Sequence, residues 1–330
     1  MAQLSGVSVA TVSRVFNGYT DVNPKTRERV LAAARELDYA PSAAARTLVG
    51  HRSQLVGVVL FTGYEHPDIE HPFFQDVLVG LKHGIGELGY DLLLFATEQP
   101  GAYLRRARHH RVDGIVLWGI DRTDPEIPKL IDAEMPLVAV DLEVAGPRAT
   151  WVSSDSVDGA RLAVRHLHAL GHTRIATITG LVETKPGRER LEGYRSELAS
   201  AGLKARPEYE QRGDFYADSG ESAMRALLAL PEPPTAVFVA ADEMAVGALQ
   251  AARTVGIRVP EDVSIVGFDD SRLAALLQPP LTTVRQDRIG LGVAAARTLA
   301  GAIEEPEEAP APSVLPVDLV VRESSTQPRE

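Results

Sequence analysis

Residues 7–18 read VSVATVSRVFNG, and this stretch organises the interpretation of the rest of the chain. Ser8 can cap a helix, because its hydroxyl can accept a free backbone N–H of the first turn. Val12, Val15 and Phe16 recur at helical spacing and form an inward face. The residues left on the outward face are Val9, Ala10, Ser13, Arg14 and Asn17. The stretch indicates either an ordinary surface helix or the reading helix of a helix-turn-helix.

The flanking residues favour the helix-turn-helix. Gly6 stands where a tight turn from an earlier helix is needed, and Gly18 suits the end of the reading helix. Asn23 can cap a third helix that opens with Pro24, where a missing N–H costs nothing. We expect this third helix to have an apolar stripe made of Val30, Leu31, Ala34 and Leu37.

A short helical segment is expected after residues 39–41, which end the third helix. Ser42 can cap residues 43–49, but about seven residues are too few to form a stable helix alone in water. Without a partner we therefore expect this segment to be a flexible linker.

Charge is distributed unevenly along the 330 residues. The net charge is −11, which at first argues against a nucleic-acid partner. Residues 1–52, however, hold seven Lys or Arg and four Asp or Glu, so residues 53–330 hold 27 basic and 41 acidic residues. A slightly basic head on an acidic body remains compatible with DNA, because phosphate binding needs only a local basic surface.

Composition excludes several other classes. The chain has no cysteine, which excludes disulfides, thiolate metal sites and cysteine nucleophiles. It has no apolar run of membrane-spanning length and no basic-then-apolar signal sequence at its start. We expect a cytoplasmic protein without a membrane partner.

From residue 55 onward, short β-rich runs alternate with helical patterns. Strands are expected at 55–61, 91–96, 114–118, 137–141, 174–179, 235–240 and 263–268. Helices are expected at 73–88, 103–110, 124–133, 156–170, 187–201, 219–230 and 242–255. Such alternation predicts parallel sheets with helices on both faces. Two such units suggest two lobes with a ligand cleft beyond the carboxyl ends of the strands.

Three stretches resemble the LacI/GalR family of bacterial transcription regulators: residues 6–15, residues 26–37 and residues 40–48. The likeness continues to about residue 322. It implies a helix-turn-helix head at 1–40, a hinge helix and linker at 41–53, and a two-lobed body of periplasmic-binding-protein type 1 architecture at 54–330. Within this body, the N-lobe is expected at about 54–153 and 285–308, and the C-lobe at about 154–284 and 309–322.

The likeness has a departure at its front. The family's first helix starts several residues earlier, and Met1 stands where the family has a valine. We therefore expect that the start codon is assigned too late and that the first helix written here has about one turn. The tail from residue 324 is polar and lacks leucine heptads, so a homodimer is expected rather than a coiled-coil tetramer.

Candidate DNA contacts lie on the reading helix and the hinge. Arg14 is the best candidate for a bidentate contact to guanine, and its alternative is a solvated surface arginine. Val9 and Ala10 suit a thymine methyl, whereas Thr11 and Ser13 suit phosphates. The remaining candidates are Asn17 on the outward face and Leu48, which the resemblance implies as an apolar wedge in the minor groove.

Candidate effector contacts lie at predicted strand ends and helix starts. Trp118 can stack on a sugar ring, and the carboxylate of Asp141 can accept two hydroxyl hydrogen bonds. Phe73 and Phe74 open a helix and can close the pocket mouth, although an aromatic residue here can equally be plain core. The resemblance implies three further contacts, which are Arg190, Phe215 and Asp269.

The identity of the effector remains open between two classes. Where the family commonly has Asn-Asp, this chain has Ala241-Asp242, which removes one amide donor and one acceptor from the expected pocket. A purine-like base is one reading, but carboxylates, an arginine and aromatic platforms favour a saccharide. We interpret the chain as a regulator, expected to be a repressor, whose dimer binds double-stranded operator DNA under control of this effector.

Other protein classes find little support in the sequence. The first expected strand is followed by TGYEHP instead of the Gly-x-Gly-x-x-Gly turn of a dinucleotide-binding enzyme, and no Gly-x-Ser-x-Gly elbow is present. His66 and His71 lie near Asp68 and Glu70, a weak metal candidate against a solvated loop. A transport binding protein would share the two-lobed body but have a signal peptide and no reading head. We expect no catalysis, no cofactor and no bound metal.

Overall fold

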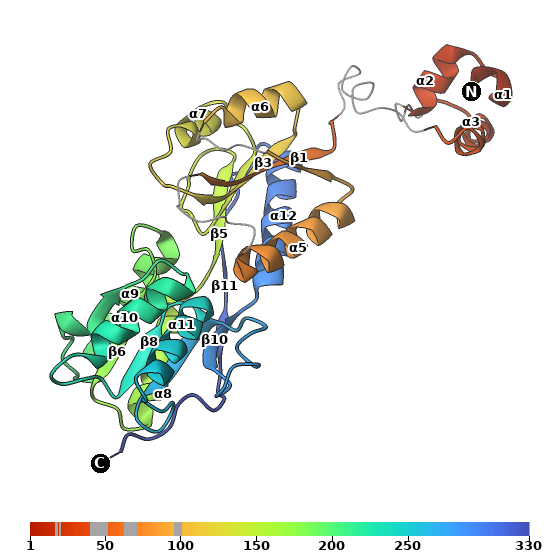
Figure 1. Cartoon of the computed structure of the whole chain (residues 1–330). Coiled ribbons are helices and arrows are strands. Elements are labelled where there is room, and N and C mark those ends of the chain that lie inside the picture. The colour runs from red at the N-terminus through yellow and green to blue at the C-terminus, as the bar shows by residue number, and fades with distance from the viewer. Residues whose placement is uncertain (17–18, 20, 40–51, 63–70, 96–100, 330) are drawn as a thin grey trace.

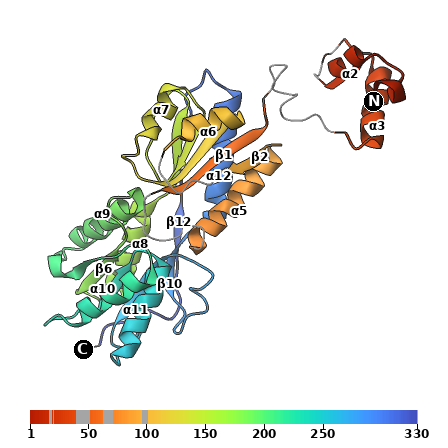
Figure 2. The ribbon, with the colours of Figure 1, turned by 45° about the horizontal axis from the view of Figure 1, so that its top comes forward.

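The computed structural model describes residues 1–16, 19, 21–39, 52–62, 71–95 and 101–329. These residues form a small helical head and a body of two α/β lobes stacked one on the other (Figures 1 and 2). None of the helices in the described ranges combines the length and the apolar character needed to cross a membrane.

The head consists of α1 (Ala2–Ser5), α2 (Val9–Phe16) and α3 (Pro24–Glu36). The predicted caps are present: the Ser8 hydroxyl accepts from the Thr11 N–H at 3.1 Å, and the Asn23 side chain accepts from the Lys25 N–H at 2.9 Å. Gly6 turns the chain between α1 and α2 with a φ of +64°, a conformation that favours glycine.

The core of the head is smaller than the sequence indicated. The helices α2 and α3 are in contact, and Val15 of α2 is buried together with Val30, Ala33 and Ala34 of α3. The prediction that Leu31 and Leu37 lie in the apolar stripe is wrong, because they are 41% and 51% exposed. Leu31 follows Val30 by one residue and so points about 100° away from it, and Leu37 lies just after the last helical residue.

Several predictions lie outside the described residues. These concern Asn17 and Gly18 at the end of the reading helix, the short helix at 43–49 with Leu48, and the histidine-containing loop residues 66–70.

The N-lobe is built around a central parallel sheet with strand order β11-β5-β4-β3-β1-β2. Its strands are β1 (Leu55–Thr62), β2 (Asp91–Leu94), β3 (Gly114–Ile120), β4 (Leu137–Val140), β5 (Ala149–Ser154) and β11 (Ser313–Leu315). All of the pairings in this sheet are parallel, as the strand–helix alternation predicted.

Two pairs of helices cover the faces of this sheet. On one face lie α5 (Pro72–Glu87) and α12 (Arg288–Glu304), which run side by side in both ribbon views (Figures 1 and 2). On the other lie α6 (Tyr103–His110) and α7 (Glu126–Asp132). Successive strand residues alternate between the two cores: Val116 and Trp118 pack under α5 and α12, whereas Ile115 and Leu117 pack under α6 and α7.

The α5 and α12 helices approach each other closely through small residues. A Cβ at Gly80 would lie 2.0 Å from the carbonyl oxygen of Ile289, and one at Gly292 would lie 2.1 Å from that of Val77. Only glycine leaves room for backbones this close, so the two helices form one tightly packed pair.

The C-lobe has the same plan, with strand order β12-β10-β9-β8-β6-β7. Its strands are β6 (Ile175–Thr179), β7 (Glu210–Arg212), β8 (Ala236–Val239), β9 (Ser264–Asp269), β10 (Thr282–Gln286) and β12 (Val317–Val320). Its helices are α8 (Ser156–Ala169), α9 (Lys185–Ser200), α10 (Ala217–Leu228) and α11 (Asp242–Thr254), with a short 3-10 turn, η1 (Pro207–Tyr209). The edge strand β12 is antiparallel to β10.

The chain passes between the two sheets three times. The passages lie between β5 and α8, between β10 and α12, and between β11 and β12. The first two fall close to the expected positions 153 and 284. The third lies at residue 316, later than the lobe boundary expected near residue 308, because β11 still pairs with β5 of the N-lobe. The polar tail also packs on the C-lobe: the buried Ser324 donates to the Ile265 carbonyl at 2.6 Å.

Candidate functional site

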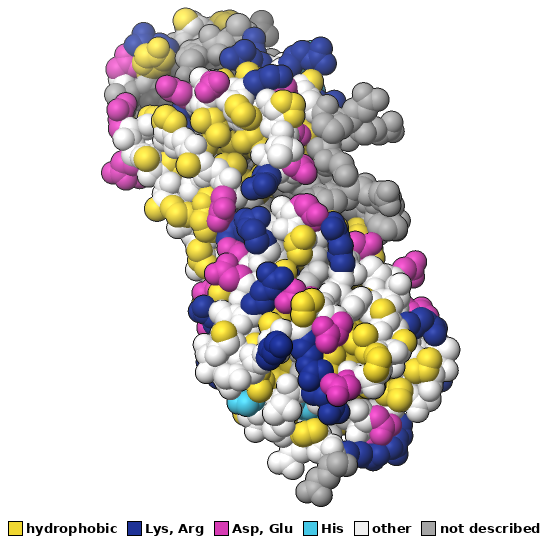
Figure 3. Space-filling view, turned by 90° about the vertical axis from the view of Figure 1, so that its left-hand side faces the viewer, with side chains coloured by type: hydrophobic (Ala, Val, Ile, Leu, Met, Phe, Trp, Pro, Cys, Tyr) yellow, Lys and Arg dark blue, Asp and Glu magenta, His cyan; other side chains and the backbone are white. Residues whose placement is uncertain are grey.

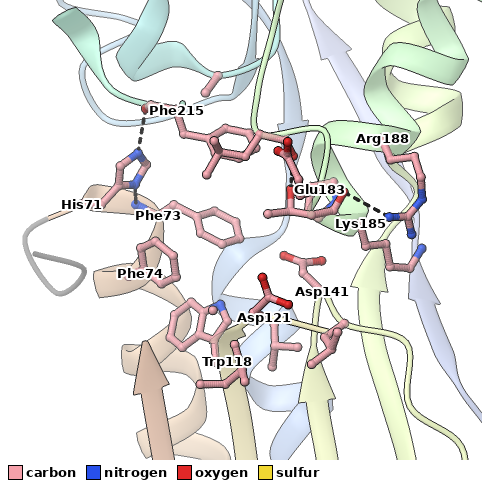
Figure 4. A pocket seen from close by; sticks show the side chains of 18 of the residues that line it. His71, Phe73, Phe74, Trp118, Asp121, Asp141, Glu183, Lys185, Arg188 and Phe215 are labelled. Carbon is pink, nitrogen blue, oxygen red and sulfur yellow. Dashed lines mark hydrogen bonds between the residues drawn. The ribbon is translucent and has the colours of Figure 1, made fainter. Parts of the chain in front are cut away.

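A cavity of about 550 Å³ lies between the two lobes. It opens beyond the carboxyl ends of the strands, where the parallel-sheet rule places ligand sites. The seven residues that the sequence proposed for effector binding all line it; they are Phe73, Phe74, Trp118, Asp141, Arg190, Phe215 and Asp269. Figure 4 shows aromatic side chains on one side of this cavity and Lys185 with Arg188 on the opposite side, with Asp141 between.

The N-lobe wall is a cluster of aromatic rings. Trp118 of β3 lies with its ring centroid 4.7 Å from that of Phe74 and 6.1 Å from that of Phe73, both at the start of α5. Trp118 is only 1% exposed, because its ring also belongs to the N-lobe core. Trp118 is therefore both a core residue and part of the cavity wall.

His71 joins the two lobes at the edge of this aromatic cluster. Its Nδ1 caps α5 by accepting from the Phe73 N–H at 3.3 Å, and its Nε2 lies 3.3 Å from the carbonyl oxygen of Phe215 in the C-lobe (Figure 4). With Nδ1 as acceptor, the neutral ring carries its proton on Nε2 and donates to Phe215. His71 also lies edge-on to the ring of Tyr216, with centroids 5.3 Å apart.

The C-lobe wall is charged and held by directed bonds. The buried Arg190 donates from Nη1 to the Ala240 carbonyl at 2.5 Å and lies 3.6 Å from Oδ1 of Asp269. Its guanidinium stacks 3.7 Å above the ring of Phe268. Its Nε is buried and has no partner among the described residues.

Burial shifts the acid–base equilibria of the cavity. It raises the pKa of Asp141 to about 7, although the positive charges of Arg190 and Lys185 oppose this shift. Burial also lowers the pKa of Arg190, against the neighbouring negative charges of Asp269 and Asp141. Behind the wall, burial and the charge of Asp269 raise the pKa of Asp242 to about 8. The cavity can therefore hold a proton near neutral pH.

Three of the non-glycine cavity residues have a left-handed backbone. Asp141 has a φ of +55°, Phe215 of +78° and Asp269 of +116°, values that non-glycine residues rarely adopt. Such strain persists only where surrounding bonds hold it, and it concentrates at ligand sites. For Asp269 one of these bonds is visible: Oδ1 accepts from Nε2 of Gln286 at 2.5 Å.

The structure adds cavity residues that the sequence did not propose for effector binding. They are His71, Asp121, Arg122, Glu143, Glu183, Thr184, Lys185, Arg188, Asp214 and Tyr216, with a few backbone and apolar neighbours. Lys185 is paired with Glu189 in its own helix and lies 4.7 Å above the Trp151 ring of the N-lobe. It also lies 3.8 Å from Glu143, which in turn lies 3.7 Å from Arg188. A polar residue just after a strand was the available signal for Asp121 and Glu143.

In the head, the proposed base-contact face of α2 is exposed. Val9 is 75% exposed, and Ala10, Ser13 and Arg14 are exposed as well, whereas Thr11 is partly covered by Ser8. Arg14 forms an ion pair with Asp21 and lies 5.3 Å above the Tyr19 ring. The guanidinium is therefore ordered at the surface rather than used in the core of the head.

One face of the molecule carries side chains of mixed charge (Figure 3). On the face drawn in Figure 3, basic and acidic side chains lie close to one another instead of forming a field of one sign. Ion pairs of the C-lobe include Arg195 with Glu210, whose Nη2 and Oε2 atoms lie 2.6 Å apart, and Arg165 with Glu197, whose Nε and Oε1 atoms lie 2.9 Å apart. Within the described ranges, no group of three or more His, Asp or Glu residues is arranged to hold a metal ion.

Comparison with known proteins places both parts of the chain. Residues 1–42 match the model of bacterial regulatory proteins of the lacI family, and residues 164–325 match that of a periplasmic binding protein-like domain. The HTH-type transcriptional regulator CelR of Thermobifida fusca is 40% identical over 98% of this chain and 96% of its own length. The ribose operon repressor of Escherichia coli (strain K12) is 37% identical over 93% of this chain and 92% of its own.

Solved structures agree with this placement. A CelR–cellobiose complex superposes with a TM-score of 0.74 at 36% identity, covering 98% of both chains. The Lac repressor dimer bound to operator and the anti-inducer ONPF superposes with a TM-score of 0.84 at 32% identity, covering 98% of this chain and 97% of that one. Among the sequence relatives, the HTH-type transcriptional repressor PurR of Aliivibrio salmonicida is 33% identical over 92% of this chain and 91% of its own length.

Proposed function

The chain belongs to the lacI family of bacterial regulatory proteins, and we propose that the effector of this repressor is an uncharged sugar bound between its two lobes. Membership confirms the resemblance seen in the sequence and makes the chain a DNA-binding transcriptional repressor under effector control, not an enzyme. One observation carries the choice of site: the seven candidate contacts converge on a single interlobe cavity of about 550 Å³.

The two unlike walls of the cavity suit a sugar. A pyranose has apolar C–H faces, which stack on aromatic rings such as Trp118 and Phe215, and a rim of hydroxyl groups. Those hydroxyls can donate to the carboxylates of Asp141 and Asp269 and accept from Arg190.

The charge of the lining favours a neutral ligand. The cavity is lined by six acidic residues and four Lys or Arg residues, so acids exceed bases by two. The acidic residues are Asp121, Asp141, Glu143, Glu183, Asp214 and Asp269. Two of the cations, Lys185 and Arg188, already face Glu143. A phosphorylated sugar would bring further negative charge into this surplus, at an electrostatic cost.

The size of the cavity leaves room for two sugar rings. A volume of about 550 Å³ lies well inside the range of pockets that enclose ligands of drug size, roughly 300–1,000 Å³. The similar CelR structure is a complex with cellobiose, a disaccharide. We therefore place one ring against the aromatic wall and a second toward Lys185 and Arg188, which line the opposite side of the cavity (Figure 4).

A purine is the second candidate, because PurR repressors are among the relatives. A planar base would stack between Phe74 and Phe215, but its edge needs paired donors and acceptors. Ala241, which lines the cavity, offers no side-chain amide for this purpose. A thermal-shift screen of cellobiose, ribose, hypoxanthine and guanine separates the two classes, because a ligand that binds only the folded state raises its melting temperature. Stabilisation by the purines alone would refute the sugar proposal.

For DNA, we propose contacts from the exposed face of α2 and from the hinge. Arg14 would leave Asp21 and bind a guanine, with Val9 and Ala10 against bases and Thr11 and Ser13 on phosphates. Asn17 and the minor-groove wedge Leu48 complete the set proposed from sequence. Arg14→Ala should remove about 1–3 kcal/mol of base discrimination while leaving most of the non-specific affinity. Anisotropy titrations in which every sequence loses affinity equally would contradict this role.

We further propose that the protein acts in the cytoplasm as a homodimer, like the Lac repressor dimer seen on its operator. Apolar side chains are exposed on α5, just after it and on the edge strand β2; they are Val79, Leu88 and Leu94, respectively. A second copy would cover them and bring two heads to a pseudo-palindromic operator. Light scattering should give twice the chain mass, and Leu94→Glu should lower it toward the monomer.

A further inference from the structure

The inference concerns a buried cluster that lies behind the cavity, where the chain passes from β10 to α12. Asp76 of α5 and Arg288 of α12 belong to N-lobe helices and are both largely buried. The Nε and Nη2 atoms of Arg288 lie 3.1 and 2.9 Å from Oδ2 of Asp76. A planar guanidinium held by two such bonds has little freedom to rotate.

The remaining terminal nitrogen of Arg288 reaches the other lobe. Its Nη1 donates to the backbone carbonyl oxygen of Asp269, at the end of β9. Asp269 is the cavity residue with the most unusual backbone, a φ of +116°. The orientation of a peptide carbonyl follows from the backbone dihedrals around it, so a fixed donor on this oxygen holds Asp269 in its strained form.

The side chain of Asp269 is fixed by different partners. Oδ1 accepts from Gln286 and faces Arg190, whereas no residue in the described ranges bonds to Oδ2. Oδ2 is thus the oxygen left for a ligand hydroxyl. Its direction into the cavity depends on the backbone that Arg288 holds.

We propose that Arg288, anchored by Asp76, is a positioning residue that sets the orientation of Asp269 for effector binding. The inference rests on the proposed function, since it takes Asp269 as an effector-binding acid. Asp76 and Arg288 move with the N-lobe and Asp269 moves with the C-lobe. Effector affinity therefore depends on the relative position of the lobes through this contact, even though neither Asp76 nor Arg288 lines the cavity.

Asp76 has a second cationic neighbour that serves as a matched control. Arg272 of the C-lobe lies 3.3 Å from Oδ1 of Asp76, but its side chain is 84% exposed. An exposed pair of this kind contributes little, because water and salt screen it. Arg272→Ala removes an arginine from the same carboxylate without touching the Asp269 carbonyl.

The direct test is structural and needs no ligand. Crystal structures of Asp76→Asn and Arg288→Lys should show the Asp269 carbonyl turned away from residue 288 and the φ angle of Asp269 changed. In the Arg272→Ala structure, the carbonyl and the φ angle of Asp269 should be unchanged. Arg288→Lys keeps a positive charge beside Asp76 but lacks the fork that also reaches Asp269, so it remains informative where Asp76→Asn fails to fold. Asp269 unchanged in Arg288→Lys would overturn the proposal.

Calorimetric titration with cellobiose tests the consequence. Asp76→Asn and Arg288→Lys should each weaken binding by about tenfold or more, and Arg272→Ala by less than about twofold. Added to Asp269→Asn, Asp76→Asn should give less than about a twofold further loss, because it acts through the same residue. If the fold-losses of affinity in Asp76→Asn and Asp269→Asn instead multiply in the double variant, Asp76 acts independently of Asp269, and the positioning role is contradicted.

The two proposals fail separately. If cellobiose does not bind the unmodified protein, or binds Asp269→Asn equally well, the sugar site is wrong. The crystal structures then still decide whether Arg288 orients Asp269.

Discussion

The two walls of the interlobe cavity are held in place by different forces. The N-lobe wall consists of rings that pack on one another and on the core, with Trp118 buried in the N-lobe core beside Phe74. The C-lobe wall consists of Arg190 and Asp269, fixed by hydrogen bonds to a carbonyl and to a glutamine amide. Packing is non-directional and tolerates small changes, whereas hydrogen bonds are directional and leave unpaired partners when one member is lost. We therefore expect the C-lobe wall to dominate effector recognition.

The largest effect should come from the C-lobe wall. Asp269→Ala removes a charged acceptor and should weaken effector binding by about 100-fold or more, since hydrogen bonds to charged groups contribute about 1.5–3 kcal/mol each. Operator affinity without effector should stay within about twofold, because the head is untouched. Calorimetry measures the first quantity and fluorescence anisotropy on operator DNA the second.

Asp318→Ala provides the control for this variant, because it removes an exposed aspartate of the same lobe. It should change neither affinity. An effector affinity of Asp269→Ala within threefold of that of the unmodified protein would contradict the expectation that the C-lobe wall dominates effector recognition.

A smaller loss of affinity, but a loss of stability as well, is expected from the N-lobe wall. Trp118→Leu should weaken effector binding by about 30-fold through lost ring contact and should lower the free energy of unfolding by about 2 kcal/mol through a cavity in the core. Urea denaturation measures the second effect. The other tryptophan offers the control, since Trp151 does not line the cavity and Trp151→Leu should have the smaller effect on effector affinity. Equal stability of Trp118→Leu and the unmodified protein would show that packing does not hold this wall.

The acid between the walls should make binding depend on pH. Burial raises the pKa of Asp141 to about 7, so the group is mostly ionised at pH 8 and mostly protonated at pH 6. If the carboxylate accepts effector hydroxyls, affinity should fall by about tenfold from pH 8 to pH 6. In Asp141→Asn the affinity should be lower at pH 8 and nearly independent of pH. A steep profile that survives in this variant would assign the proton elsewhere.

The raised pKa of Asp141 also predicts the smallest of these effects, a change in the free energy of unfolding with pH. The folded-state pKa of Asp141 exceeds the ordinary value of 3.8, so its ionised form is disfavoured by folding and stability falls as pH rises from about 4 to about 7. Asp141→Asn avoids this cost. Without effector, the variant should gain about 1 kcal/mol over the unmodified protein between pH 5 and pH 8, allowing for screening by cavity water. Thermal melts at the two pH values measure this difference, and a gain that grows toward low pH would contradict it.

The sequence predicted the architecture because its signals are local. Hydrophobic runs such as those of β1 and β3 and the helices between them follow periodicity, and the helical head with two parallel-sheet lobes is confirmed by the Lac repressor superposition. Several strands were not predicted, and β10 explains why. It reads TTVRQ, a polar sequence whose strand character comes from its place between β9 and β12.

Site residues divide in the same way. Trp118 and Asp141 follow from the rule that ligands bind beyond strand ends, and the structure brings both to the cavity. Arg190, Phe215 and Asp269 came from the family resemblance rather than from their own spacing. Lys185, Arg188 and Glu143 were not singled out, because they meet only when one lobe faces the other, a relation that no local pattern carries.

The tight pair of α5 and α12 has a mechanical consequence. From Arg288 to Ile303, α12 rises about 1.5 Å per residue, so it spans roughly 22 Å through the N-lobe. One end touches Asp269 at the cavity, and at the other the Ile303 carbonyl accepts from Nη2 of Arg52 at 2.9 Å, next to the segment that leads to the head. Because its glycines allow close packing against α5, α12 resists bending. A tilt of α12 at Arg288 is therefore expected to displace the opposite end of the helix, at Ile303, as a rigid body.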